Sequence, residues 1–415
     1  MIVTRNMREE MSSRLGVFVL YVILAILFLV VNAKEHTPPK KFFNVLKYGA
    51  VADGITDNKK AFVKAWSDAC NHSGRSRVLI PKGKGAYKLG SVTFSGPCRA
   101  HQMAFLIKGT IKAPTDWPDF DTDTWIAFNY VSKLVVKGGG YLDGQGQYAW
   151  SLNDCASNSR CPALPATLRF NFVNKSRITH LRSINSKNTH IHIFASHKIK
   201  ISQVRLTAPS NSPNTDGIKI GSSTGIRISR SIIQTGDDCI AMVAGSKNIR
   251  VSQVTCGPGH GISIGSIGKN VGEVVSDVHV TNCTFVGTDN GARIKTWAPS
   301  NASLVSDILF AYIFMKDVRN PIFIDQHYCP SHHCTNLRGD DSKVGINNVT
   351  FKNIWGTSTS KIALALDCSA LVPCKNINIV DINLRYFRHH GGPARSSCSN
   401  VFGQSSGKQI PSGCL

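Results

Sequence analysis

Acidic residues are scarce in this sequence. Its 415 residues include 25 Asp and Glu against 48 Lys and Arg, so the formal net charge is +23 with neutral histidine. A protein this basic attracts polyanions, which makes nucleic acid and acidic polysaccharide the two partner classes to consider. A solvated basic surface without any partner is the third interpretation, and charge alone does not choose among them.

Long apolar runs are also scarce, since one alone is present, at residues 15–31. Three arginines precede it and the small-residue stretch "VNA" ends it, as in a secretory signal peptide. The alternative is an uncleaved membrane anchor, because the run approaches the length that spans a bilayer. We predict that residues 1–33 are a signal peptide cleaved after Ala33, leaving no stable membrane association. Secretion favours an acidic polysaccharide over nucleic acid as the partner.

The Cys/His spacing of a zinc finger is missing, which excludes a structural metal site of that kind. Thirteen cysteines instead suit an oxidising compartment, and their odd number leaves at least one thiol unpaired. The sequence leaves the pairing open, but several cysteines lie close together along the chain: Cys155 and Cys161, Cys329 and Cys334, Cys368 and Cys374, Cys398 and Cys414. Five N-x-S/T sequons also fit passage through the secretory pathway: Asn71, Asn174, Asn282, Asn301 and Asn348.

A helical period of apolar residues is absent from about residue 170 onward, and short alternating strands recur instead. Equivalent apolar positions lie 21 to 30 residues apart: Ile178, Ile199, Ile226, Ile249, Val278 and Ile308. Each unit carries a second apolar strand, such as "GIKIG", "CIAMV", "GISIG" or "ARIKT", and Cys239 and Cys256 lie about one unit apart. Repeats of this length predict a solenoid whose units bury their faces against one another.

The Leu-x-x-Leu-x-Leu grid of a leucine-rich repeat is also missing, and the units favour Ile, Val and Gly. We therefore predict an all-β protein in which residues 34–415 form a single-domain, right-handed parallel β-helix. A short N-terminal capping helix is expected at residues 56–70, with Thr56 or Asp57 as its N-cap. Its apolar face would consist of Ala61, Phe62, Ala65, Trp66 and Ala69.

The repeat places three polar residues at equivalent positions. Asp216, Asp238 and His260 are separated by 22 residues each, and each stands two residues before an isoleucine assigned to the core. Equivalent positions on successive coils of a parallel β-helix stack about 4.8 Å apart. The three side chains should therefore form a ladder, with Asp237 beside Asp238.

A single Asp at such a position is usually a cap for a turn. Three carboxylates and a histidine on adjacent rungs are harder to explain in that way, because like charges this close repel and raise one pKa. Glycoside hydrolysis needs such a set, since one carboxyl protonates the leaving oxygen while another activates water. Nearby glycines would let a substrate approach the backbone: Gly217, Gly236, Gly259 and Gly261.

Two cations follow in "ARIKTW". Arg293 and Lys295 flank Ile294, so both point outward by strand alternation while Ile294 points into the core. Beside a carboxylate cluster they would receive an anionic group, although a solvated face is the commoner role of such a pair. Trp297 and Tyr328 are candidates for sugar contacts, with simple packing as the alternative.

At this point the sequence resembles a known family. "NTDGI", "GDDCI", "GHGISIGS" and "RIKTW", in this order and at these separations, resemble the four motifs of the polygalacturonases. The similarity extends from "FNVLKYGAVADG" to the C-terminal cysteines, and "YLDGQGQYAW" resembles the plant branch, particularly its exo-acting members. The resemblance implies a parallel β-helix that hydrolyses α-1,4-linked galacturonan with inversion and without a metal or other cofactor.

The resemblance also implies a role for each motif residue. Asp237 is the general acid, Asp216 and Asp238 hold and activate water, and His260 tunes the protonation of the acid. The implied substrate-binding residues are Arg293, Lys295, Tyr328 and Asn214. In "DQHYC", His327 stands where a smaller polar residue is expected.

Three rival functions share the fold. A pectate lyase would eliminate rather than hydrolyse, using calcium, and a rhamnogalacturonan hydrolase would lack the Arg293–Lys295 pair. A catalytically silent polysaccharide-binding β-helix would show lesions in the acid motifs, and the sequence has none. We expect a secreted monomer of the cell wall that acts on galacturonan, with exo action favoured over endo action.

Overall fold

The computed structural model describes residues 7, 11, 14–25, 40–115, 122–153, 164–330, 341–387 and 393–415. The chain divides into two compact units, Met1–Lys40 and Lys41–Leu415. In the first unit, residues 14–25 are helical. Within the described ranges, no helix has both the length and the apolar character needed to cross a membrane. Cleavage after Ala33 stays a prediction.

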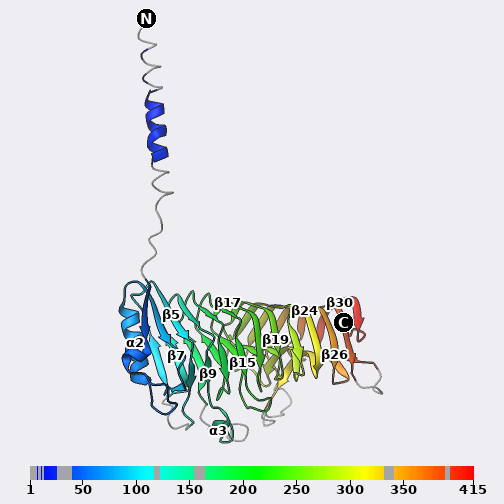
Figure 1. Ribbon diagram of the computed structural model, residues 1–415. Helices are drawn as coiled ribbons and strands as arrows, with labels where there is room; N and C mark the ends of the chain where they lie inside the picture. Colours follow the sequence, from blue (N-terminus) through cyan, green and yellow to red (C-terminus); the bar gives the residue numbers. More distant parts are fainter. Residues whose placement is uncertain are drawn as a thin grey trace. The chain divides into compact units, whose positions relative to one another are not determined.

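The second unit is a right-handed parallel β-helix, as the sequence repeats predicted (Figure 1). From β2 onward, hydrogen-bonded neighbours run parallel in both of its sheets, and each pair joins successive coils. The first sheet, which we call sheet B, contains β4 (Val92–Ser95), β7 (Thr124–Asn129), β10 (Ala166–Asn171), β13 (Ile191–Phe194), β16 (Ile218–Gly221), β18 (Ile240–Met242), β20 (Ile262–Ile267), β23 (Asn290–Trp297), β25 (Asn320–Tyr328), β27 (Ile362–Asp367) and β29 (Arg395–Ser399).

The other sheet, sheet A, supplies the remaining walls of the coils. It contains β1 (Lys40–Asn44), β2 (Arg75–Ile80), β3 (Ala86–Lys88), β5 (Gln102–Ile107), β6 (Thr110–Lys112), β8 (Leu134–Lys137), β9 (Tyr141–Asp143), β11 (Arg177–Thr179), β12 (Arg182–Ile184), β14 (Lys200–Ser202), β15 (Arg205–Thr207), β17 (Thr224–Gln234), β19 (Lys247–Cys256), β21 (Val274–Thr281), β22 (Thr284–Val286), β24 (Ser303–Val318), β26 (Val344–Ser358), β28 (Cys374–Tyr386) and β30 (Val401–Ile410).

The core consists of apolar side chains stacked from coil to coil. Ile218, Ile240 and Ile262 are register partners on β16, β18 and β20, and all three are fully buried, as predicted. The predicted row on sheet A is correct from Ile226 onward but not at its start. Ile178 pairs with Ile201 rather than with Ile199. The offset is two residues, so Ile178 still points into the core.

The repeats begin earlier than residue 170, where the sequence pattern first became regular. Coils already form at β2, β4 and β5, and their core is aromatic rather than aliphatic. Phe94 packs against Trp66, Phe105 and Phe128 with ring centroids 5.1 to 5.4 Å apart. These large side chains fill the end of the β-helix beneath its cap.

The capping helix is α2 (Lys59–Asn71), and the five apolar residues assigned to its buried face are buried. The predicted N-cap was wrong, because Asn58 occupies the N-cap position. Asp57 still accepts a hydrogen bond from the backbone N–H of Lys59 at 3.0 Å. The hydroxyl of Thr56 instead donates to Asp53. Two short helical segments complete the described elements, η1 (Val45–Tyr48) and α3 (Gln147–Trp150).

Disulfides join several cysteines that lie close in sequence. The bonded pairs are Cys70–Cys98, Cys239–Cys256, Cys368–Cys374 and Cys398–Cys414. Cys283 is a buried free thiol, in agreement with the odd cysteine count. Cys329 is also disulfide-bonded. Cys155, Cys161 and Cys334 lie outside the described residues.

Candidate active site

The polar ladder lies just before the first residues of β16, β18 and β20, three successive strands of sheet B. Because Ile218, Ile240 and Ile262 are register partners, the residues two positions before them occupy equivalent places on three coils. The backbone follows the same pattern, since Asp238 O accepts a hydrogen bond from Gly217 N at 2.9 Å. The structure thus brings Asp216, Asp238 and His260 to adjacent rungs, as the 22-residue spacing predicted.

Asp238 is held as a buried carboxylate. It is 2% exposed, and its Oδ2 lies 2.8 Å from Nζ of Lys295. Its Oδ1 accepts a hydrogen bond from the Ser263 hydroxyl at 2.7 Å. Burial alone would lower the pKa of Lys295, but the charge of Asp238 reverses this effect and the pKa is raised. The pair is therefore an ion pair with its geometry fixed by three coils.

Asp237 forms a second pair, with His260. Its Oδ1 lies 3.0 Å from Nδ1 of the imidazole and also accepts the backbone N–H of Asp238 at 2.7 Å. Burial would raise the pKa of Asp237, but the hydrogen bond and charge of His260 outweigh it and the pKa is lowered. The same hydrogen bond raises the pKa of His260 against the effect of burial. Together the two groups retain one proton, which rests on the imidazole.

Asp216 is the carboxyl whose pKa rises. Burial is the main cause, and repulsion from Asp237 adds to it against the attraction of Lys219, so the pKa of Asp216 reaches about 7. The side chain belongs to a residue that is only 7% exposed. Repulsion between like charges was expected from the sequence to raise one carboxyl pKa; the affected group is Asp216, and repulsion contributes less than burial.

The two cations of "ARIKTW" lie on the outer side of β23, with Ile294 in the core, as alternation predicted. They are not openly displayed, however, since Arg293 is 8% exposed and Lys295 7%. Nη2 of Arg293 lies 3.7 Å from Asp325 Oδ2, and its Nε has no hydrogen-bond partner within the described part of the chain. An incompletely satisfied guanidinium beside the carboxylates can accept an anionic ligand group.

Tyr328 closes this side of the site. Its ring centroid lies 5.2 Å from both the Arg293 guanidinium carbon and Lys295 Nζ, and 5.2 Å from the ring of Trp297. The structure therefore brings Tyr328 to the two cations, as predicted. Trp297 packs against Tyr328, which fits the packing interpretation of this residue.

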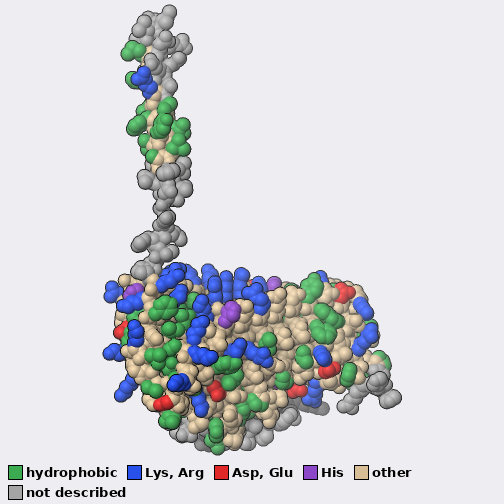
Figure 2. Space-filling view, in the orientation of Figure 1, with side chains coloured by type: hydrophobic (Ala, Val, Ile, Leu, Met, Phe, Trp, Pro, Cys, Tyr) green, Lys and Arg blue, Asp and Glu red, His purple; other side chains and the backbone are tan. Residues whose placement is uncertain are grey.

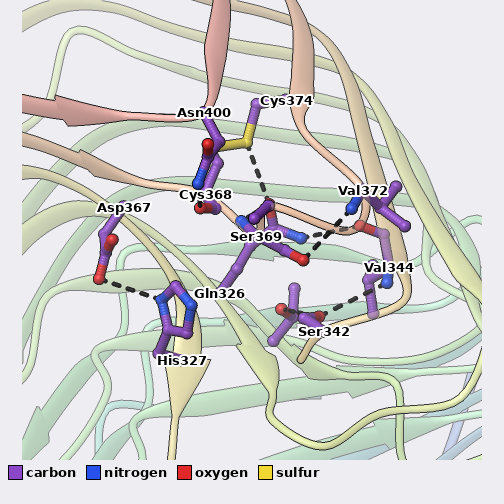
Figure 3. The surroundings of a disulfide bond; sticks show 12 residues. Gln326, His327, Ser342, Val344, Asp367, Cys368, Ser369, Val372, Cys374 and Asn400 are labelled. Atoms are coloured by element: carbon purple, nitrogen blue, oxygen red, sulfur yellow. Dashed lines mark hydrogen bonds and ion pairs between the residues drawn. A yellow bond between two sulfur atoms is a disulfide. The ribbon is translucent and has the colours of Figure 1, made fainter. Parts of the chain in front are cut away.

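The Cys368–Cys374 disulfide supports the strand that carries Tyr328 (Figure 3). Gln326, fully buried on β25, accepts the backbone N–H of Ser369 at 3.1 Å and donates to Val344 O at 2.8 Å. Between Gln326 and Tyr328, the His327 ring lies 3.1 Å from Asp367 (Figure 3). The unexpected histidine is thus engaged by a carboxylate at the rim of the site.

Two sequence expectations need qualification. Asn214 is exposed with a left-handed backbone (φ 55°), and its side chain meets Asn153 at 3.5 Å, so its substrate contact stays a prediction. The four glycines were assigned to substrate approach, but the coils need them for packing. A Cβ at any of them would lie 2.0 to 2.6 Å from a backbone oxygen of a neighbouring segment. At Gly261 this coincides with a φ of 86°.

A metal site must also be considered, because ligand atoms of Asp237, Asp238 and His260 lie within 4.8 Å of one another. Both oxygens of Asp238 are already engaged, one of them by the ammonium group of Lys295. A divalent cation would have to displace that positive charge from a buried position. The donor set therefore fits proton transfer better than metal binding.

Sequence reasoning missed several polar residues on the outer face of sheet B. The missed residues are His192, Lys219 and Ser263, and they belong to the register row that also contains the predicted Arg293. Burial and the charges of Arg169 and Lys219 lower the pKa of His192 to about 4. Strand alternation in "GIKIG" and "GISIG" was the available signal, since the residue between two core isoleucines points outward.

Comparison with known proteins identifies the family. The family model "Glycosyl hydrolases family 28" matches residues 70–407. An exopolygalacturonase of Platanus acerifolia is 45% identical over 370 residues, covering 89% of this chain and 96% of that protein. A polygalacturonase of Gossypium barbadense is 42% identical over 406 residues, covering 97% of each.

Solved structures support the fold. An endo-xylogalacturonan hydrolase from Aspergillus tubingensis gives a TM-score of 0.75 at 24% identity, covering 88% of this chain and 100% of the other. An exopolygalacturonase from Thermotoga maritima gives 0.70 at 20% identity, covering 89% and 93%. The family match spans most of the sequence, including all four motifs. The chain belongs to glycosyl hydrolase family 28 and is a glycoside hydrolase.

Proposed function

We propose that this chain is a secreted exopolygalacturonase that hydrolyses the α-1,4 bonds of galacturonan with inversion in the cell wall. The observation that carries the proposal is the pairing of a proton-holding Asp237–His260 couple with a fixed Asp238–Lys295 ion pair in one site. The plant relatives named exopolygalacturonase and polygalacturonase support the substrate class.

In this mechanism Asp237 delivers a proton to the glycosidic oxygen while Asp216 and Asp238 orient and deprotonate the attacking water. The C1–O bond breaks as the water oxygen bonds to C1 from the opposite face. His260 supplies the proton that Asp237 needs, through the 3.0 Å hydrogen bond. Once Asp237 is protonated its charge no longer repels Asp216, so Asp216 ionises more readily and can act as a base.

Arg293 and Lys295 give the site its preference for a uronic acid. Both are nearly buried, so a sugar carboxylate that reaches Arg293 is bound away from competing water. Tyr328 contacts both cations and limits the space in which the sugar ring can lie. Asn214 is proposed as a further substrate contact at the exposed side.

Product analysis tests the proposal. The purified chain is incubated with polygalacturonic acid, with and without a chelator, and the released sugars are resolved over time. We expect saturated monogalacturonate from the earliest points and no effect of the chelator. A ladder of saturated oligomers would replace exo by endo action. Unsaturated products would identify a lyase, and absence of products would favour a silent binding protein.

A further inference from the structure

A row of positive side chains runs along sheet A. Arg177 on β11, Lys200 on β14 and Arg227 on β17 are successive register partners, and all three are exposed. We call these three residues the cation ladder. Neighbouring strands place them about 4.8 Å apart. Arg250 on β19 continues the row but is paired with Asp277 at 2.6 Å.

Further cations border the ladder on both sides. Those in the adjoining turns and strands that are exposed are Lys133, Lys175, Arg182, Lys198, Arg205 and Arg230. Two hollows of 380 and 500 Å³ lie between them and share Arg177 and Lys200 in their walls. Figure 2 shows Lys and Arg gathered in a dense row along the upper edge of the β-helix.

Acidic residues do not neutralise this surface. Residues 164–255 contain thirteen Lys and Arg but three acidic residues, and all three acidic residues are the carboxylates of the active site. Within the described ranges, no ladder residue has a carboxylate at ion-pair distance. The positive potential therefore remains available to a ligand.

Such an arrangement is unfavourable for folding. Like charges directly opposite on neighbouring parallel strands repel, and here three occur in succession. The pleat does not require them, because the outward positions two residues later hold Thr179, Ser202 and Ser229. Solubility needs only dispersed charge. A polyanion that bridges the rungs would turn this repulsion into attraction.

The ladder is separate from the active site. In the coil that carries Asp216, this carboxylate precedes β16 of sheet B, whereas Arg227 follows β16 on sheet A. Asp216 and Arg227 are thus separated along the chain by β16 and the turn that follows it. A polymer bound along the ladder would lie on sheet A and would leave the catalytic residues beside sheet B unoccupied.

We propose that the cation ladder is a non-catalytic binding surface for the free carboxylates of an acidic polysaccharide. One uronate chain lies along the axis of the β-helix and holds the enzyme on the polymer that it digests. The identity of the polymer as galacturonan rests on the proposed function. The inference that the ladder binds a polyuronate rests on charge complementarity and does not depend on the proposed function.

The test compares two triple variants of the full chain with equal loss of charge. Arg177→Gln/Lys200→Gln/Arg227→Gln removes the ladder. Lys60→Gln/Lys64→Gln/Lys84→Gln removes three exposed cations at the capped end. Binding to immobilised polygalacturonate is measured over a range of salt, in an Asp237→Asn background that prevents digestion. N-glycans are trimmed first, because the Asn174 sequon adjoins the ladder.

We expect the ladder variant to bind roughly tenfold more weakly with a reduced salt dependence, and the control variant to bind within about twofold of the parent. Fully methyl-esterified pectin should not distinguish the variants. With active Asp237 restored, kcat/KM on soluble trigalacturonate should be unchanged in both. Equal weakening by both variants, or loss of activity on trigalacturonate, would overturn the proposal.

Binding of the same variants to two other polyanions, DNA and phosphatidylserine vesicles, is measured as well. If the ladder variant lost binding to DNA or to phosphatidylserine vesicles but kept binding to polygalacturonate, the inference would be wrong. Failure of the proposed function is a different result. A parent chain that releases no sugar from polygalacturonate but binds it through the ladder would refute the hydrolase assignment and leave the binding surface intact.

Discussion

Asp237 and His260 share one proton in the active site. In the free site it rests on His260, because the carboxylate of Asp237 is stabilised by the imidazolium and by Lys295. Asp216 competes for a proton near neutral pH. The proposed general acid, Asp237, is therefore not the carboxyl with the raised pKa. Its role must be tested by kinetics on suitable substrates.

Asp237→Asn should lower kcat on polygalacturonate by about 10²- to 10⁴-fold, because an amide cannot deliver the proton. Binding of the polymer should be little affected. An aryl galacturonide with an acidic phenol leaving group needs little protonation, so this variant should hydrolyse it much more nearly at the parental rate. Steady-state kinetics on both substrates provide the measurement.

Asp216→Asn and Asp238→Asn are the controls for this assignment. Both should be slow on the activated substrate as well, because the water still lacks its base. If the aryl substrate instead rescued Asp216→Asn, the acid would be Asp216. Parental activity of Asp237→Asn on the polymer would remove Asp237 from the mechanism altogether.

The raised pKa of Asp216 also predicts a pH-dependent effect on stability. The pKa is about 7 in the folded chain against 3.8 for an ordinary Asp. Below pH 4 the group is protonated in both states, and as pH rises towards 7 the unfolded chain gains relative stability. Asp216→Asn should therefore raise the Tm at pH 8 and have little effect at pH 4, with a gain of at most about 4 kcal/mol. Equal Tm differences at both pH values would contradict a raised pKa.

Arg293→Ala should raise the KM for polygalacturonate by roughly 10- to 100-fold, the range for a lost charge-assisted hydrogen bond. Methyl-esterified substrate should be affected much less, since it carries no carboxylate. Lys295→Ala should differ, because it leaves Asp238 buried without its 2.8 Å partner and must lower kcat as well. If both polymers responded alike to Arg293→Ala, Arg293 would not be the carboxylate receptor.

At the scale of the element, the cap and the first coils form one aromatic cluster. Trp66 of α2 is 4% exposed, packs on Phe94 and donates its indole N–H to Ser95 O at 3.0 Å. Trp66→Ala should destabilise the fold by about 3–5 kcal/mol, measured by urea unfolding. Lys64→Ala, exposed on the same helix, should change stability by less than about 0.5 kcal/mol. A small effect of Trp66→Ala would mean that the coils do not depend on the cap.

The strands that could be predicted from the sequence are those in which core isoleucines recur at a regular spacing. Ile218, Ile240 and Ile262 gave the register directly, and the register placed Asp216 and Asp238 on adjacent rungs. The β-helix was predicted from residue 34, but its individual coils before residue 170 were not located, because aromatic residues such as Phe128 fill their core without a regular aliphatic pattern. Local spacing also could not show that Lys295 is bonded to Asp238, since that contact depends on how consecutive coils stack.

At the scale of the whole molecule, the net charge and the disulfides both fit the secretion that we propose. Net charge is +23, and Figure 2 shows Lys and Arg gathered along one edge of the face in view. Four disulfides join pairs of cysteines within the described residues, and Cys329 is disulfide-bonded as well. Both features suit a secreted protein that meets acidic polymers outside the cell.

The thiol content tests this environment for the entire chain. Cys283 is 2% exposed, and burial raises its pKa to about 11, so it should resist alkylation in the folded protein. If Cys155 pairs with Cys161 and Cys329 with Cys334, unfolding without reductant should expose one thiol per molecule, located at Cys283 by mass spectrometry. Three or more labelled cysteines would show that at least one of these two pairs is not formed. Rapid labelling of the native protein would instead show that solvent reaches Cys283 beside β22, because a buried thiol with a raised pKa reacts slowly.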